Sequence, residues 1–284
     1  MTEHVLVWHP QVPGEAPGGG DDKLRLIGMP TGLLRPARQA LAADQLTPRA
    51  RAVMHEVLAD LARQALTPSE LPTRISLDDL DETDKATVAD ILGEGDVWAK
   101  VGTRDTYWRI VESVLAGVWR LEASTADGTT SEWIEVGQVP QPILTAAAEQ
   151  QRGTIDIPAH APQGAMNALP LLAELQQRSS AYQPGAENHV INFTLLPITE
   201  VDTQVLTSAL GQIPLVIRSG GYGSSRVFAT GLRHVWAVQY ITSMGHVILD
   251  TLEIGGVPVS VLAAREDFED SAERLGEILE AFTS

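Results

Sequence analysis

The chain has 284 residues, of which 44% are hydrophobic, and it contains no cysteine. Its 20 basic and 37 acidic residues give a formal net charge of −17, and its isoelectric point is near 4.7. The length allows one large domain or two ordinary ones, and the acidity disfavours binding to nucleic acid or to anionic membranes. The lack of thiols excludes disulfides, thiolate nucleophiles, iron–sulfur ligation and cysteine-based zinc sites.

The first residues have neither the basic start nor the apolar core of a secretion signal, and no apolar run approaches the length of a membrane span. We therefore expect a cytoplasmic protein without membrane insertion. Residues 1–22 are rich in proline and glycine and are predicted to form a flexible N-terminal lead. A short strand is expected at 24–27, before a turn at Gly28-Met29-Pro30.

A first α+β unit is predicted over residues 23–144. A helix is expected to begin at Pro48 with Thr47 as its cap. A second helix over 81–92 has the acidic start that the helix dipole favours and ends at Gly93. Strands are expected over 73–77, before this helix, and over 97–101, 106–115, 118–123 and 132–136 after it. A hairpin turn at Asp127-Gly128 is expected between the last two.

The second unit is predicted over residues 166–284, after a linker at 145–165 that contains Ala146-Ala147-Ala148 and then Pro158, Pro162 and Gly164. Its helices are expected at 167–178 and, capped by Thr199, up to Leu210. A last amphipathic helix over 266–282 has no counterpart in the first unit. Strands are expected over 189–196, 215–218, 226–232, 234–241 and 246–254.

The two units are copies of one another. Residues 109–121 align with 226–238 at a separation of 117 residues, and 134–140 align with 252–258 at 118. The sequence therefore predicts an α+β fold of two homologous units, each an antiparallel sheet with helices on one face. We expect a pseudo-twofold axis to relate the units, as it does when a homodimer interface becomes internal. Trp119 and Trp236 hold equivalent places and are expected in the core.

The glycine-rich turn at 220–226 occurs only in the second unit. Its backbone N–H groups and arginine could hold an anion, but the sequence lacks the phosphate-binding loop and dinucleotide patterns. A hairpin or bulge that needs positive φ explains the glycines more simply. Residues that distinguish the second unit are the candidates for partner binding: Gly220, Gly221, Tyr222, Gly223, Ser225, Arg226, Thr230, Arg233, Gln239, Tyr240 and Asp250.

No enzymatic chemistry is predicted. The seven histidines show no metal-ligand spacing, and a triad of Ser224 or Ser225 with His234 and Asp250 lacks a nucleophile elbow. We therefore expect no catalytic residue, metal or cofactor. The alternative is a small-ligand protein or enzyme that uses the turn from Gly220 to Arg226 as an anion site.

The chain resembles the HupH/HyaF hydrogenase expression proteins. The resemblance is carried by the segments 167–175, 191–197, 219–226, 232–240, 249–253 and 269–275, and by 28–30 and 112–120 in the first unit. It implies an accessory role in [NiFe]-hydrogenase maturation, in which the protein holds the small-subunit precursor before export. That precursor carries a twin-arginine signal, and a thioredoxin-like accessory protein is a further implied partner. The family pattern has a cysteine where this chain has Ser225, so no thiol role is implied there.

Overall fold

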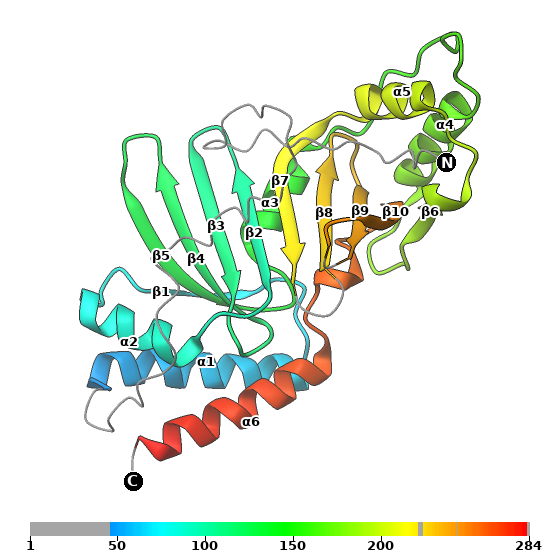
Figure 1. Ribbon diagram of the computed structural model, residues 1–284. Helices are drawn as coiled ribbons and strands as arrows, with labels where there is room; N and C mark the ends of the chain where they lie inside the picture. The colour runs from blue at the N-terminus through cyan, green and yellow to red at the C-terminus, as the bar shows by residue number, and fades with distance from the viewer. Residues whose placement is uncertain (1–45, 221–223, 243, 283–284) are drawn as a thin grey trace.

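The computed structural model describes residues 46–220, 224–242 and 244–282. Within them the chain forms one antiparallel sheet of ten strands in the order β1-β5-β4-β3-β2-β7-β8-β9-β10-β6 (Figure 1). The strand predicted at 24–27 and the turn at 28–30 lie outside the described residues. The strands are β1 (Thr73–Ser76), β2 (Val97–Gly102), β3 (Thr106–Glu112), β4 (Val118–Thr125), β5 (Thr130–Val136), β6 (His189–Asn192), β7 (Gln212–Ser219), β8 (Ser224–Thr230), β9 (Val235–Ile241) and β10 (Val247–Ile254).

The helices lie on both faces of this sheet. They are α1 (Pro48–Leu66), α2 (Glu82–Leu92), α3 (Gln141–Gln150), α4 (Ala168–Ala181), α5 (Glu200–Leu210) and α6 (Arg265–Ala281), with short 3-10 turns η2 (Phe193–Leu195) and η3 (Val259–Val261). Figure 1 shows α1, α2 and α6 together over one end of the sheet and α4 with α5 at the other end, while α3 lies behind the central strands. The α+β class with an antiparallel sheet is confirmed, but the prediction of helices on one face only is wrong, because α3 covers the other face.

Local sequence signals set the helix ends. The hydroxyl of Thr47 accepts the N–H of Ala50, and Thr199 forms a reciprocal capping box with Asp202. Gly93 and Gly211 end α2 and α5 with φ near +60°, a conformation that glycine adopts without steric cost. These caps match the predicted helix boundaries because capping depends on neighbouring residues alone.

Alternation along the strands separates two cores. On β4, Val118 packs with α1, α2 and α6, while Trp119 and Leu121 point to the opposite face and pack with α3. Trp236 is buried in the same α3-side core, so both tryptophans are core residues as expected. A third cluster lies under α4 and α5 and includes Phe228 of β8. Because successive side chains of a strand point to opposite faces, one sheet carries three separate cores.

The two units join through β2 and β7, which pair in antiparallel register with Ala99 opposite Ile217. Each unit therefore supplies half of one continuous sheet rather than a separate sheet. The strand order is the same in both units when it is followed outward from this junction. The first unit gives β2-β3-β4-β5-β1, and the second gives the corresponding strands β7-β8-β9-β10-β6.

Two helices differ from the prediction, α3 because its residues were not predicted to be helical and α6 because of the unit on which it packs. Helix α3 overlaps the start of the predicted linker, and its Ile143 and Ala146 are buried against the central strands. Helix α6 follows the second unit but packs against α1 of the first, where Phe268 and Leu275 are fully buried. None of the helices in the described part of the chain combines the length and apolar character that crossing a bilayer would need.

Glu112 lies near Asp267 of α6, and its carboxyl group makes the free energy of unfolding depend on pH. Burial raises the pKa of Glu112 from 4.5 to about 7, with smaller contributions from Asp267 and Asp96, and the N–H of Gly117 only partly offsets the shift. The unfolded chain releases this proton near pH 4.5, whereas the folded chain keeps it until about pH 7. The free energy of unfolding should therefore fall by roughly 2–3 kcal/mol as pH rises through this interval.

Urea titrations across this pH range test the prediction. Glu112→Gln should flatten the pH dependence and raise stability at pH 8, whereas Glu277→Gln on the exposed face of α6 should change neither. An unchanged pH profile in Glu112→Gln would show that another group dominates.

Candidate partner-binding surface

The middle of the sheet, on the face that carries α1, α2, α4, α5 and α6, bears a row of mainly polar side chains. Consecutive register pairs place one residue of each central strand in line, and paired positions project from the same face. We call this line the central row; it consists of Arg120, Val111, Trp98, Arg218, Arg226, Gln239 and Asp250.

An aromatic ring and three guanidinium groups define the chemistry of the central row. The guanidinium carbon of Arg218 lies 5.0 Å from the ring centroid of Trp98, and the ammonium of Lys100 lies 6.0 Å from it. Burial, as the largest cause, lowers the pKa of Arg120. Beside the row, Arg109 forms an ion pair with Glu122. Stacked and partly desolvated arginines favour planar anionic groups and backbone carbonyls as partners.

Three of the sequence-predicted residues meet in this row. Arg226 pairs with Gln239 across β8 and β9, and Gln239 pairs with Asp250 across β9 and β10. Gln239 and Asp250 are buried, and Arg226 is half-buried. The backbone N–H of Asp250 is tied to the hydroxyl of Thr194 at 3.1 Å. Strand pairing therefore fixes the backbone at these three positions.

The other predicted residues lie elsewhere. Ser225 and Tyr240 pair across β8 and β9 but face the α3 side of the sheet. Thr230 is fully buried, and its hydroxyl donates to the carbonyl of Val235 at 2.8 Å, which is a structural contact within the hairpin. Arg233 is exposed at the β8–β9 turn, the opposite end of β8 from the glycine turn.

The glycine turn itself is described only at its first residue. Gly220 is exposed, and its N–H donates to the carbonyl of Asp96 at 2.7 Å, linking the turn to the residue that precedes β2 of the first unit. Gly221, Tyr222 and Gly223 lie outside the described residues. The start of the turn is therefore at the junction of the two units, beside Arg218 on β7.

The model of the HupH hydrogenase expression protein C-terminal conserved region matches residues 48–157 and 165–282. The chain belongs to this HupH family. It is 37% identical over 246 residues to the hydrogenase expression/formation protein HupH of Rhizobium leguminosarum bv. viciae, covering 85% of this chain and 86% of the relative. It is 32% identical over 244 residues to the hydrogenase-1 operon protein HyaF of Escherichia coli K12, covering 86% and 85%. The solved HupH of Thiobacillus denitrificans matches 42% of this chain and 97% of its own, with 26% identity and a TM-score of 0.36.

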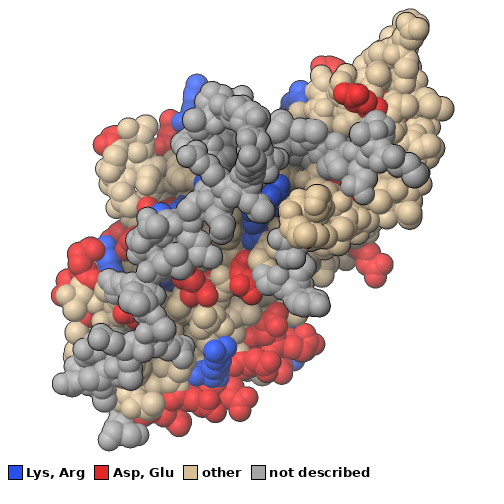
Figure 2. Space-filling view, in the orientation of Figure 1, with Lys and Arg blue, Asp and Glu red and all other residues tan. Residues whose placement is uncertain are grey.

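The predicted resemblance to HupH and HyaF is thus confirmed, and the family match falls in two parts that follow the two units. The surface of this HupH-family chain is uneven in charge. Figure 2 shows Lys and Arg side chains in the middle of the view, over the central strands, and Asp and Glu side chains gathered along its lower edge, where α6 lies. In the described ranges there is no group of three or more His, Asp or Glu residues that could hold a metal ion.

The first-unit members of the central row were not predicted. Trp98 and Arg120, like Lys100 beside the row, alternate with buried residues along β2 and β4, and this alternation was the available signal. Arg218 follows three consecutive buried residues on β7, so no such alternation marks it. The sequence could not show that β2 pairs with β7, so these residues could not be placed beside Arg226.

Proposed function

We propose that the chain is a non-enzymatic accessory protein of [NiFe]-hydrogenase maturation that holds the small-subunit precursor in the cytoplasm before export. The match of both units to the HupH family carries this proposal. The names of the relatives, hydrogenase expression/formation protein and hydrogenase-1 operon protein, agree with it. A thioredoxin-like accessory protein is the second partner that we propose.

The central row is the contact surface that we propose for the precursor. It spans both units, is rich in arginine, and is held in place by neighbouring strands. Aromatic and arginine side chains are the residue types that dominate binding energy at protein interfaces. The acidic remainder of the surface should add long-range attraction for a basic segment, which salt would weaken.

Co-purification with the small-subunit precursor, with and without its signal, tests this function. Arg226→Ala should reduce capture roughly tenfold, because a central interface arginine is lost. Arg104→Ala should leave capture unchanged, because Arg104 is exposed in the β2–β3 loop outside the row. No capture by the wild-type chain would refute the function, whereas equal capture by Arg226→Ala would refute only the surface.

An anion site near the glycine turn is the second candidate. Arg218 and Arg226 occupy paired positions on β7 and β8, close to Gly220, and two adjacent guanidinium groups favour an anionic ligand. Inorganic phosphate or a nucleotide should then raise the melting temperature in the manner of a specific ligand. A melting temperature that shifts equally in wild type and Arg226→Ala would argue against this site.

We further infer that a local twofold axis relates the two units. Ala99 and Ile217, which face each other across β2 and β7, are 118 residues apart, the same separation as the aligned segments of the two copies. Equivalent residues opposite one another are what a twofold axis between them requires. This relation is tested by superposing residues 70–144 on 190–262. A twofold axis requires that the same rotation also places 190–262 on 70–144.

A further inference from the structure

The strand β1 is an edge strand of the sheet that the described residues form. Within the described residues it pairs only with β5. The N–H of Leu77 donates to the carbonyl of Glu132 at 3.0 Å, which fixes the alternation along the strand. Ile75 and Thr73 therefore face β5, and the N–H and C=O groups of Arg74 and Ser76 face outward. An unpaired edge of this kind can accept an additional strand.

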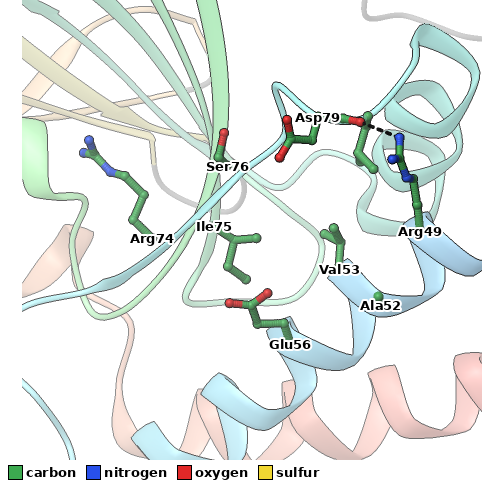
Figure 3. Close-up of a pocket in the computed structure, with 9 residues that line it drawn as sticks. Arg49, Ala52, Val53, Glu56, Arg74, Ile75, Ser76 and Asp79 are labelled. Carbon is green, nitrogen blue, oxygen red and sulfur yellow. Dashed lines mark hydrogen bonds between the residues drawn. The ribbon is translucent and has the colours of Figure 1, made fainter.

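A groove runs beside this edge. A cavity of about 520 Å³ separates β1 from α1 and is lined by Ala52, Val53, Glu56, Ile75 and Leu80 among others. Figure 3 shows the side chain of Glu56 rising from α1 toward Ile75, with Val53 further along the same helix. Ala52, Val53, Ile75 and Leu80 give the groove an apolar part, and polar and charged side chains make up the rest of its lining.

Two carboxylates and two arginines line the groove, and one of these arginines, Arg74, forms an ion pair with Glu135 outside it. Glu56 and Asp79 are exposed at its two sides. Of the arginines that line it, Arg49 donates to the backbone carbonyl of Asp79 at 3.1 Å. The Arg74 guanidinium is turned to the other face, where it donates to Glu135 at 2.6 Å and lies 5.3 Å from the ring centroid of Trp108. A basic side chain is therefore the complement of this groove.

We propose that the groove beside β1 binds an extended, arginine-bearing segment of the partner, which adds to the sheet as a strand. Its backbone bonds to the outward groups of Arg74 and Ser76, an apolar side chain packs on Val53 and Ile75, and an arginine lies near Glu56. The inference rests on the proposed function, since the precursor supplies such a segment. The groove and the central row then bind different parts of one partner.

Ser76→Pro is the variant that tests whether the edge of β1 binds an added strand. Proline removes the outward N–H of residue 76 and fills the space of the added strand, while the ladder to β5 keeps its bonds. The matched control is Val190→Pro on β6, the opposite edge. The backbone N–H of Gly255 donates to the carbonyl of His234, so the N–H and C=O groups of Glu253, two residues earlier, also point toward β9. The backbone groups of Val190, which lies opposite Glu253 on β6, therefore point outward. Both substitutions remove one outward N–H and leave the remaining ladder intact.

Fluorescence anisotropy with the full chain provides the readout. The probe is a short labelled peptide in which valine alternates with arginine, and a second peptide carries glutamate in place of each arginine. Ser76→Pro should weaken binding of the arginine peptide roughly tenfold or more, and Val190→Pro should not. Glu56→Gln should weaken it by a smaller factor and reduce its salt dependence. The glutamate peptide should bind more weakly than the arginine peptide in every case.

Four outcomes overturn the assignment. Equal affinity of wild type and Ser76→Pro shows that the peptide binds elsewhere, and equal affinity of the two peptides removes the charge argument. A dimer of the free chain that dissociates in Ser76→Pro shows that a second copy of the chain occupies the edge. If the precursor is captured normally by Ser76→Pro, the groove assignment fails while the proposed function stands; if wild type binds the peptide but captures no precursor, the function fails.

Discussion

Replacing Asp202 by alanine is expected to lower the free energy of unfolding by roughly 3–5 kcal/mol. The side chain of Asp202 is fully buried between the starts of α4 and α5. One oxygen accepts the N–H groups of Met166, Asn167 and Ala168, each at 2.8 Å, and the other accepts the N–H and hydroxyl of Thr199. Alanine would leave five donors without this acceptor at two helix starts.

The pKa of Asp202 supports the same expectation. Burial alone would raise it, but the hydrogen bonds from Thr199, Asn167 and Ala168 outweigh burial and lower it from 3.8. The ionised carboxylate therefore stabilises the fold above pH 3.8, and this contribution should be lost as pH falls through the lower, folded pKa. The loss should be absent in the alanine variant.

Urea denaturation at neutral pH measures the effect as a shift of the midpoint at constant slope. Glu200→Ala is the matched control, because Glu200 is an exposed acidic residue in the first turn of the same helix. It should cost only about 0.5 kcal/mol through the helix dipole. Equal midpoints for Asp202→Ala and Glu200→Ala would show that water satisfies the five donors.

Phe268→Ala is expected to cost roughly 3–5 kcal/mol, because it removes the largest buried side chain of α6 and leaves a cavity. The ring packs directly on Gly117, where an added Cβ atom would lie 2.4 Å from Cε1 of Phe268. The hydroxyl of Ser271 also donates to the carbonyl of Ala116 at 3.0 Å. These contacts hold α6 on the first unit.

Chemical denaturation and limited proteolysis check this prediction together. If α6 docks as an independent element, Phe268→Ala should expose it to cleavage before the sheet unfolds. Glu269→Ala, on the exposed face of the same helix, should leave cleavage and midpoint unchanged. Gly117→Ala should approach the effect of Phe268→Ala, since it combines φ of +80° with the clash. A Phe268→Ala midpoint equal to that of wild type would place the anchor of α6 elsewhere.

The sequence alone determined the features that depend on near neighbours or on the internal repeat. Caps such as Thr47 and Thr199, the Asp127-Gly128 turn and strand alternation predicted most elements, because each signal lies within a few residues. The matching segments predicted two copies of one unit, and the motifs indicated the HupH family. Helix α3 was missed because its alanines and flanking prolines resemble a linker, and only its contact with the central strands explains its burial.

Only the tertiary structure decided how distant segments meet. The pairing of β2 with β7 brings Trp98 beside Arg218 and thereby creates the central row from both units. The return of α6 to α1 and the position of β1 at the edge of the described sheet have the same origin. Such contacts depend on which buried faces and strand edges remain to be covered once each unit has formed, and a single sequence read locally carries no record of that choice.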